Sequence, residues 1–208
     1  DNPNSSILSS VAVFNAIPQS TGAIIKLGDS QKTAITSSDR LFFGNYVTYK
    51  NWFSGNFNVI VENQSNNVWH SMQTNVFLAT GRFYSLFLYN NKGIKTLLSE
   101  DNILSPSAGK VKIRVAHLGD NLANVNVESS AASGLLFRNI KYETVSEYIE
   151  IDAALLHNFT VQSVDGEIKL FSKEEKKLEN KGIYTILIKG YVAANGNTDA
   201  IDFSIIKQ

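Results

Sequence analysis

The sequence predicts an all-β protein built from two tandem β-sandwiches. Three observations support this prediction: many strand-forming residues, turn signals at short intervals, and a second half that repeats the first. Of the 208 residues, 43% are hydrophobic and 11% are aromatic, with twelve Phe and eight Tyr. Aromatic and β-branched side chains favour strands because they pack well on a pleated surface. About seven short strands per 100 residues, separated by turn residues, are typical of a β-sandwich.

The repeat is visible as four matched segments in the same order in both halves. Such order predicts an internal duplication, in which each half is one structural unit. Three of the matches have an offset of 102 positions, and the fourth has an offset of 100. The pairs are VAVFNAIP (11–18) with IRVAHLGD (113–120), AIIKL (23–27) with VNVES (125–129), NFNVIV (56–61) with NFTVQS (158–163), and YSLFLYN (84–90) with YTILIKG (184–190).

Composition along the chain predicts where the two copies begin and end. The first residues are polar and rich in Asn and Ser, which is typical of a tether that leads into a fold. The segment LSPSAGK places Pro and Gly between two strand-like runs and therefore indicates a boundary. The expected organisation is a tether at 1–9, a first β-sandwich at 10–104, a linker at 105–109 and a second β-sandwich at 110–208.

Alternating and continuous apolar runs identify strands within the second copy. VKIRVAH (111–117) and VSEYIEI (145–151) alternate, as expected for strands with one buried face. YTILIKG (184–190) is continuously apolar before its final Lys and suits a central strand. The charged segment SKEEKKLENKG (172–182) is the best candidate for a helix, but we favour a solvated hairpin tip followed by a strand.

Two tyrosines are expected to act as structural residues. NKGIY (180–184) has the Asn-x-Gly-x-Tyr form found where a tyrosine corner opens a strand, and TGRFY (80–84) is a looser counterpart. In such a corner the phenol hydroxyl bonds back to nearby backbone and ties a loop to the sheet. Tyr84 and Tyr184 are therefore predicted to be structural, although both are equally compatible with ordinary strand aromatics.

Charge and cysteine content narrow the classes of function. The formal net charge is zero, whereas a nucleic-acid-binding protein usually carries a basic excess. The absence of cysteine excludes disulfides, thiolate metal sites and a cysteine nucleophile. No apolar run approaches the roughly 20 residues that a membrane-spanning helix needs. We therefore expect no nucleic-acid partner and no cofactor.

The sequence contains no recognisable catalytic or metal-binding constellation. His70, His117 and His157 are 47 and 40 residues apart, without local carboxylate partners, so no metal site is predicted. There is no G-x-S-x-G nucleophile motif and no defined carboxylate pair, so we predict a protein that is not an enzyme. His117 is expected to end a strand and to bond the following loop, which contains Asn121, through its ring nitrogens. A ligand contact or a calcium ion at such a loop stays open.

An aromatic-rich stretch of the first copy is the candidate binding site. FFGNYVTYKNWFSGNF (42–57) concentrates seven aromatic residues, and Trp69 follows in the next strand-like run. Sugars stack their C–H faces on exposed rings, while amide side chains bind hydroxyls. Core packing and a patch for a protein partner are the two alternatives. The speculative ligand-binding platform consists of Tyr49, Asn51, Trp52 and Trp69.

Three segments of the second copy resemble a known family. RVAHLGDNLANVNV (114–127), LLFRNIKYETVSEYIEI (135–151) and GIYTILI (182–188) are similar to the bacterial domain-of-unknown-function family 4397, whose pattern begins roughly R-V-V-H-A-S-P-D-A-P-A-V-D-V. His117 stands at the family His and Asn121 at the family Asp. The first copy resembles the family loosely, and Asn15 stands in it where His117 stands in the second.

The resemblance implies immunoglobulin-like or prealbumin-like sandwiches in an exported protein. Similar proteins are often tandem lipoproteins of Bacteroidetes-type bacteria, anchored at the outer membrane or cell surface. We therefore expect membrane attachment only through a lipid on a residue preceding the tether. The expected function is a non-catalytic surface binding or adhesion module with a glycan or protein ligand. The alternative is a structural or assembly subunit of an envelope complex.

Overall fold

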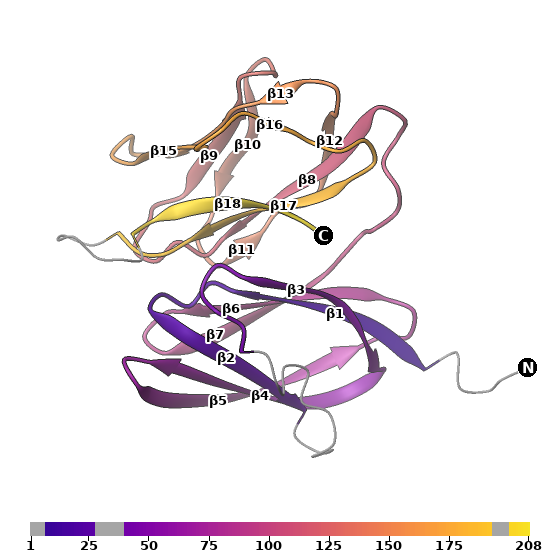
Figure 1. Ribbon diagram of the computed structural model, residues 1–208, viewed down its shortest axis with the longest axis vertical. Helices are drawn as coiled ribbons and strands as arrows, with labels where there is room; N and C mark the ends of the chain where they lie inside the picture. Colours follow the sequence, from indigo (N-terminus) through magenta and orange to yellow (C-terminus); the bar gives the residue numbers. More distant parts are fainter. Residues whose placement is uncertain (1–6, 28–39, 193–199) are drawn as a thin grey trace, which may run out of the picture. The chain divides into compact units, whose positions relative to one another are not determined.

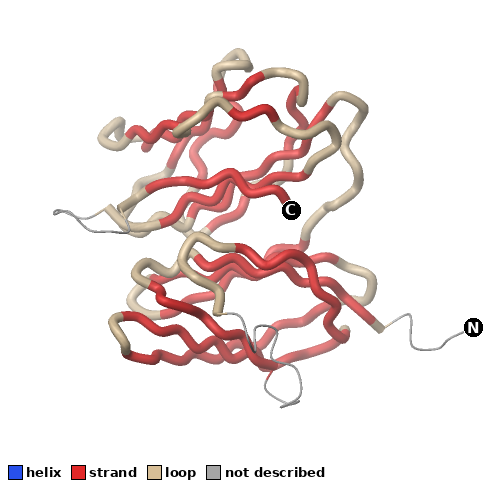
Figure 2. Tube along the Cα trace, viewed as in Figure 1, coloured by secondary structure: helices blue, strands red, loops and turns tan. Residues whose placement is uncertain are grey.

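The computed structural model describes residues 7–27, 40–192 and 200–208, which form strands and no helix (Figures 1 and 2). The all-β prediction is confirmed. No helix in this described part is long and apolar enough to cross a membrane. The chain divides into two compact units, unit 1 (Asp1–Asn102) and unit 2 (Ile103–Gln208). Most of the expected tether, 1–6, lies outside the described residues, and its last two residues belong to the first strand.

Unit 1 contains a four-stranded and a three-stranded sheet. The first sheet has the order β3-β1-β6-β7 and the second has the order β2-β4-β5. The strands of the first sheet are β1 (Leu8–Asn15), β3 (Tyr46–Phe53), β6 (Phe83–Asn90) and β7 (Ile94–Glu100). The strands of the second sheet are β2 (Ser20–Leu27), β4 (Gly55–Ser65) and β5 (Val68–Leu78).

Unit 2 repeats this plan with shorter and more interrupted strands. Its first sheet has the order β11-β8-β17-β18, with β12 also paired to β8, and its second has the order β10-β9-β14-β15. The first sheet consists of β8 (Lys110–His117), β11 (Thr144–Val145), β12 (Ile149–Asp152), β17 (Ile183–Lys189) and β18 (Asp202–Lys207). The second consists of β9 (Val125–Ser129), β10 (Leu135–Ile140), β14 (Phe159–Ser163) and β15 (Lys169–Phe171). A separate small pair joins β13 (Leu156–His157) to β16 (Lys176–Lys177).

The same parallel pair lies at the centre of each first sheet. β1 runs parallel to β6, with Val11 opposite Tyr84, and β8 runs parallel to β17, with Ile113 opposite Tyr184. The flanking partners β7 and β18 are antiparallel in both units. The segment 172–182 forms no helix and includes β16, in agreement with the preference stated from sequence.

Strand pairing corrects one of the sequence matches. Ile25 lies opposite Val61 in unit 1, and Val127 lies opposite Val161 in unit 2. Since 23–27 corresponds to 125–129, Val61 corresponds to Val161, an offset of 100 rather than 102. The two-residue error was invisible in the sequence because side chains alternate with a period of two, so the shifted alignment kept the same residues facing inward.

Each unit has its own apolar core between its two sheets. In unit 1 the core includes Val11, Val13, Leu86 and Leu88 from the first sheet and Val59 and Val61 from the second. In unit 2 the corresponding positions include Val115 and Ile186 from the first sheet and Val127 and Val161 from the second. These buried strand residues provide the main favourable contribution to folding, because their apolar surface is removed from water.

Candidate functional site

Tyr84 and Tyr184 form the same contact in the two units. The Tyr84 hydroxyl accepts a hydrogen bond from the Ala79 N–H at 3.0 Å, and the Tyr184 hydroxyl accepts one from the Glu179 N–H at 2.9 Å. Both rings are buried. Each bond runs back to the loop that precedes the strand, as a tyrosine corner requires. These two buried residues therefore hold loops to sheets.

Asn15 and His117 occupy equivalent strand ends and make equivalent bonds. Asn15 Oδ1 accepts the Ile17 N–H at 2.9 Å, and its Nδ2 donates to the Leu41 carbonyl at 2.7 Å. His117 Nδ1 accepts the Gly119 N–H at 3.3 Å, and its Nε2 donates to the Ala123 carbonyl at 3.0 Å.

Both side chains are fully buried, and both organise the loop that follows their strand. Burial lowers the pKa of His117 despite the opposing effect of its backbone bonds, which favours the neutral ring. The proton of this ring is on Nε2, because Nε2 faces a carbonyl and Nδ1 accepts an N–H. Asn121, in the same loop, is exposed and has a left-handed φ of 58°, a conformation that asparagine tolerates in turns.

The structure does not bring the four residues of the predicted platform together, because Trp52 and Trp69 lie on different sheets. Trp52 lies on β3 of the first sheet, is 4% exposed and packs in the core of unit 1. Trp69 lies on β5 of the second sheet and is 43% exposed. Tyr49 donates a 2.5 Å hydrogen bond to the Asp101 carboxylate, and exposed Asn51 accepts one from Ser10 at 3.4 Å. Of the two tryptophans, Trp69 alone presents its ring to solvent.

Trp69 belongs to a larger polar surface that the sequence analysis missed. Alternate residues of β4 and β5 point inward, including Val59, Val61 and Leu78, so the intervening residues point outward. This outward surface carries five neutral amide side chains. We call it the amide face, and it consists of Asn56, Asn58, Ile60, Glu62 and Gln64 on β4 and Trp69, Ser71, Gln73, Asn75 and Phe77 on β5.

One end of the amide face is organised by Arg40. Gly22, Gln64 and Trp69 form a row across β2, β4 and β5, and Arg40 lies along this row. The guanidinium donates to Gln64 Oε1 at 2.8 Å and lies 5.0 Å from the centre of the Trp69 ring, a cation–π distance. Gly22 has a φ of 144°, and a Cβ there would lie 2.7 Å from the Cβ of Arg40, so this position requires glycine.

The remaining amides are spaced along the strands at every second position. Asn58 donates weakly to Gln73 at 3.4 Å, and Lys26 pairs with Glu62 at 2.9 Å. Phe77, at the far end of β5, is 62% exposed. The signal in the sequence was the alternation N-x-N-x-I-x-E-x-Q followed by W-x-S-x-Q-x-N-x-F. The face combines exposed rings with neutral donors and acceptors, a chemistry suited to a ligand that has both hydroxyl and C–H surfaces.

A serine–histidine pair in unit 2 was also missed by the sequence analysis. Ser129 Oγ and His157 Nδ1 are 2.8 Å apart, and His157 Nε2 lies 2.7 Å from the Asp152 carbonyl. Both side chains are almost fully buried, and Ser129 Oγ also accepts the Ala131 N–H at 3.2 Å. The pair therefore ties β9 to β13, just before β14. No group of three or more potential metal ligands occurs among the residues that the structure describes.

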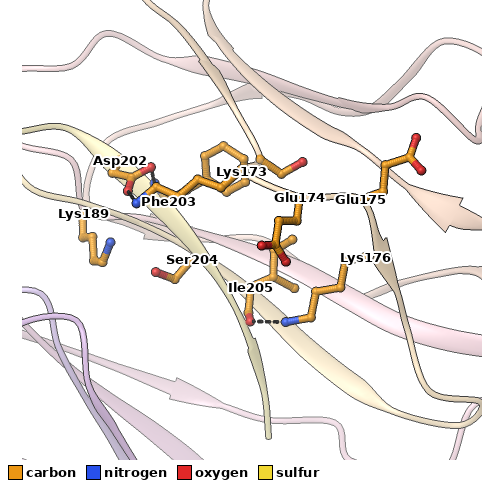
Figure 3. Close-up of a pocket in the computed structure, with 10 residues that line it drawn as sticks. Lys173, Glu174, Glu175, Lys176, Lys189, Asp202, Phe203, Ser204 and Ile205 are labelled. Atoms are coloured by element: carbon orange, nitrogen blue, oxygen red, sulfur yellow. Dashed lines mark hydrogen bonds and ion pairs between the residues drawn. The ribbon is translucent and has the colours of Figure 1, made fainter.

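A hollow of about 490 Å³ lies in unit 2 beside strand β18 (Figure 3). One side is the charged segment Ser172–Lys176, and the other is the edge of β18 from Asp202 to Ile205. Lys173 lies 3.6 Å from Asp202, and Lys176 donates to the Ile205 carbonyl at 3.2 Å. The hollow is thus bounded by charges of both signs, and Lys173 and Lys176 contact the strand across it. The segment Ser172–Lys176 covers the edge of β18.

The family of the chain follows from a comparison of its sequence with family models. The model described as Domain of unknown function (DUF4397) matches residues 9–128, more than half of the chain, so the protein belongs to this family. The match covers unit 1 and the first two strands of unit 2 up to Glu128, whereas the sequence analysis found only a loose resemblance in the first copy. The segments 135–151 and 182–188 lie outside it.

Comparisons with curated proteins and with solved structures add no further assignment to the family. A comparison with curated proteins gives no match. Among solved structures, a family 26 carbohydrate-binding module of Amy13K from Eubacterium rectale, in complex with maltoheptaose, is 9% identical, with 97% of each chain covered and a TM-score of 0.26. A candidate cell adhesion protein from Bacteroides eggerthii is also 9% identical, with 97% of this chain and 95% of that chain covered and a TM-score of 0.20. Structural similarity at these TM-scores supports no argument about this protein.

Proposed function

We propose that the protein is a non-catalytic binding module that binds a glycan on the amide face of unit 1. The observation that carries this proposal is the exposed Trp69 ring, in one row with Arg40 and Gln64 and beside further amides on the same sheet surface. This arrangement keeps a large apolar ring at the surface, although the same unit buries its other tryptophan.

The chemistry of the face matches that of a sugar chain. The C–H face of a pyranose is apolar and stacks on an indole, while its hydroxyls both donate and accept hydrogen bonds. Asparagine and glutamine offer both functions in one side chain without a net charge. β4 and β5 each extend over 11 residues, roughly 37 Å at about 3.4 Å per residue, which is long enough for several sugar units.

The test is a binding screen of the intact protein against soluble polysaccharides and mucin, with Trp69→Ala as the variant. We expect at least one ligand to bind and the variant to bind it about tenfold or more weakly, since each 1.4 kcal/mol of lost stacking is about tenfold in affinity. Phe53→Ala is the matched control, because Phe53 is a 59% exposed aromatic on β3 of the other sheet. A ligand that binds equally well to all three proteins would contradict the proposal, as would the absence of any ligand.

Arg40 determines which sugars the face prefers. Its guanidinium has described contacts with Gln64 and Trp69 and is otherwise exposed, so it has donors available for a ligand. We expect Arg40→Gln to weaken binding of uronic-acid polysaccharides more than binding of neutral ones, because the carboxylate loses a charged partner. Equal losses for both classes would show that Arg40 acts only by orienting Trp69.

The proposed place of action is the outer surface of the cell envelope, with attachment through a lipid that precedes the polar residues 1–9. Protease treatment of intact cells that express the full-length protein tests this location, since a surface protein is degraded and an internal one is protected. The second candidate function is an assembly subunit of an envelope complex. It is favoured by the edge of β5, which is the last strand of its sheet and pairs with no further strand among the described residues.

A further inference from the structure

Strand β5 ends its sheet and, within the described residues, carries none of the charges or prolines that usually protect an edge strand. It pairs with β4 on one side, and within the described residues no backbone hydrogen bond joins its other side to another segment. Its sequence, VWHSMQTNVFL, contains no Asp, Glu, Lys, Arg, Pro or Gly over 11 residues. Long, uncharged edge strands readily accept another strand, and natural proteins usually prevent this with charges, prolines or a covering loop.

The other edge strands of the described residues are protected. Each one longer than two residues has at least one charged side chain, as in β2, β3, β7, β10, β12, β15 and β18. The edge of β18 shows the strongest protection (Figure 3). Lys176 donates to the Ile205 carbonyl on that edge, Lys173 lies beside Asp202, and Lys207 is paired with Glu179. The absence of such protection on β5 therefore distinguishes it from the other edges.

We propose that β5 pairs antiparallel with β5 of a second copy of this chain, about a two-fold axis at Gln73. The strand is chemically close to a palindrome about this residue. On the amide face, the pairing places the Trp69 and Phe77 rings on each other twice. On the other face, it places aliphatic residues together at the ends. The pairs are Val68 with Leu78, Trp69 with Phe77, His70 with Val76, Ser71 with Asn75, Met72 with Thr74, and Gln73 with itself.

This register is preferred over the neighbouring ones. A shift by one residue would place outward side chains of one copy opposite inward side chains of the other, and therefore expose core residues. A shift by two residues keeps the faces but separates Trp69 from Phe77. The two rings are 43% and 62% exposed, so their pairing across strands removes apolar surface from water. No like charges meet anywhere along this ladder.

The dimer would extend the three-stranded sheet into a continuous sheet of six strands, β2-β4-β5-β5-β4-β2. Two amide faces would then lie side by side on one surface. This assembly and the proposed function share the Trp69 ring, but their tests are separate: this one measures mass, so a failure of glycan binding leaves the assembly intact, and a monomeric protein leaves glycan binding intact.

The test uses the charge at the two-fold axis. Gln73 is exposed, so Gln73→Lys and Gln73→Glu should fold normally. In the dimer each variant places two like charges directly opposite each other, which destabilises the pair. Sedimentation equilibrium of the full chain over a range of concentrations should show a wild-type dimer and two variants that are each monomeric. An equimolar mixture of the variants should restore the dimer, because the introduced amine of one copy then lies opposite the introduced carboxylate of the other.

Restoration in the mixture identifies the strand, because only a residue that lies close to its own copy across the two-fold axis gives this pattern. Thr48→Lys, which adds the same charge at an exposed position of β3, is the control and should remain dimeric. A wild type that is monomeric at all concentrations would overturn the proposal, including the case in which β5 binds a strand of another protein. Variants that remain dimeric alone would also overturn it.

Discussion

The two units share the features that hold their sheets and loops together, and they differ in the length of their second sheets. Both have a parallel central pair, a tyrosine that bonds back to the preceding loop, and a buried strand-end side chain that closes the next loop. The second sheets differ: β4 and β5 have 11 residues each, whereas β14 has five and β15 three. The duplicated architecture therefore constrains the core and the loop closures, while the outer hairpin of unit 1 was free to lengthen.

The outward side chains of these two hairpins also differ, as the strand lengths do. β5 carries no formal charge, and its outward residues are amides, a serine and two rings. β15 consists of Lys169, Leu170 and Phe171, with the Lys169 amine 5.3 Å from the Phe171 ring. The long, amide-rich surface of β4 and β5, in contrast to the short β15 with its lysine, is the reason for placing the candidate site in unit 1.

The largest expected effect is on the free energy of unfolding, and it differs between the two tryptophans. Trp52→Ala should lower the free energy of unfolding of unit 1 by about 3–5 kcal/mol, because it removes a large buried side chain from the core. Trp69→Ala should lower it by well under half of that, since the ring is partly exposed. Both can be measured by urea unfolding, with the remaining tryptophan as the fluorescent probe, because the protein has two tryptophans and both are in unit 1.

Trp52→Phe provides the control for this pair. The buried indole Nε1 of Trp52 has no hydrogen-bond partner within the described residues, so its removal relieves an unsatisfied donor and offsets part of the lost packing. We expect a cost smaller than that of Trp52→Ala by at least about 2 kcal/mol. Equal costs for the two variants would mean that an aromatic ring at this position contributes no packing, since both variants remove the indole N–H.

The burial of Trp52 could not be predicted from the sequence, for a physical reason. Val13 lies opposite Val47, but Val11 lies opposite Lys50, so β3 contains one extra residue at this bulge. The extra residue reverses the alternation of side chains along the strand. Trp52, opposite the buried Ser9, therefore faces the core, where a strict alternation would place it on the other face from Val47.

Other features of the fold and the candidate site could be predicted from the sequence only where they depend on residues close together in the chain. Strands, turns and the duplication depend on nearby residues, so the all-β class and the roles of Tyr84 and Tyr184 were accessible. Arg40 was not, because its position over Gly22 and Trp69 arises from tertiary packing of three strands with a segment outside them. The role of Asn15 became clear only from its bonds, since Asn and His share no sequence signal for closing a loop.

The two tyrosine corners should have equal but separate effects. Tyr84→Phe leaves the Ala79 N–H without its acceptor, and Tyr184→Phe does the same to the Glu179 N–H. Each loss should cost about 1–2 kcal/mol, the usual penalty for an unsatisfied partly buried donor. Differential scanning calorimetry should show that each variant shifts the unfolding of its own unit. A shift of both units by one variant would show that they unfold together.

The smallest expected effect is on the stability of unit 2. It depends on the strand-end residue His117 and appears only in mild acid. Because burial lowers the pKa of His117 below its ordinary value of 6.5, the unfolded chain takes up a proton more readily than the native one. The stability of unit 2 should therefore fall as the pH drops below about 6.5. His117→Asn, which copies the residue of unit 1, should flatten this dependence, as measured by thermal unfolding between about pH 7.5 and about pH 5.

Two features allow the contribution of His117 to be distinguished from that of other groups in this pH range. Glu150 and Asp152 also have lowered pKa values, because Ser107 donates to one and Lys110 to the other, but their contribution is lost only as the pH falls below their ordinary values of 4.5 and 3.8. His70→Asn is the matched control, since it makes the same substitution on β5 of unit 1, whereas the expected effect is on the stability of unit 2. If His117→Asn retains the full wild-type slope, the acid sensitivity of unit 2 arises elsewhere, and the Asn and His closures differ only in shape.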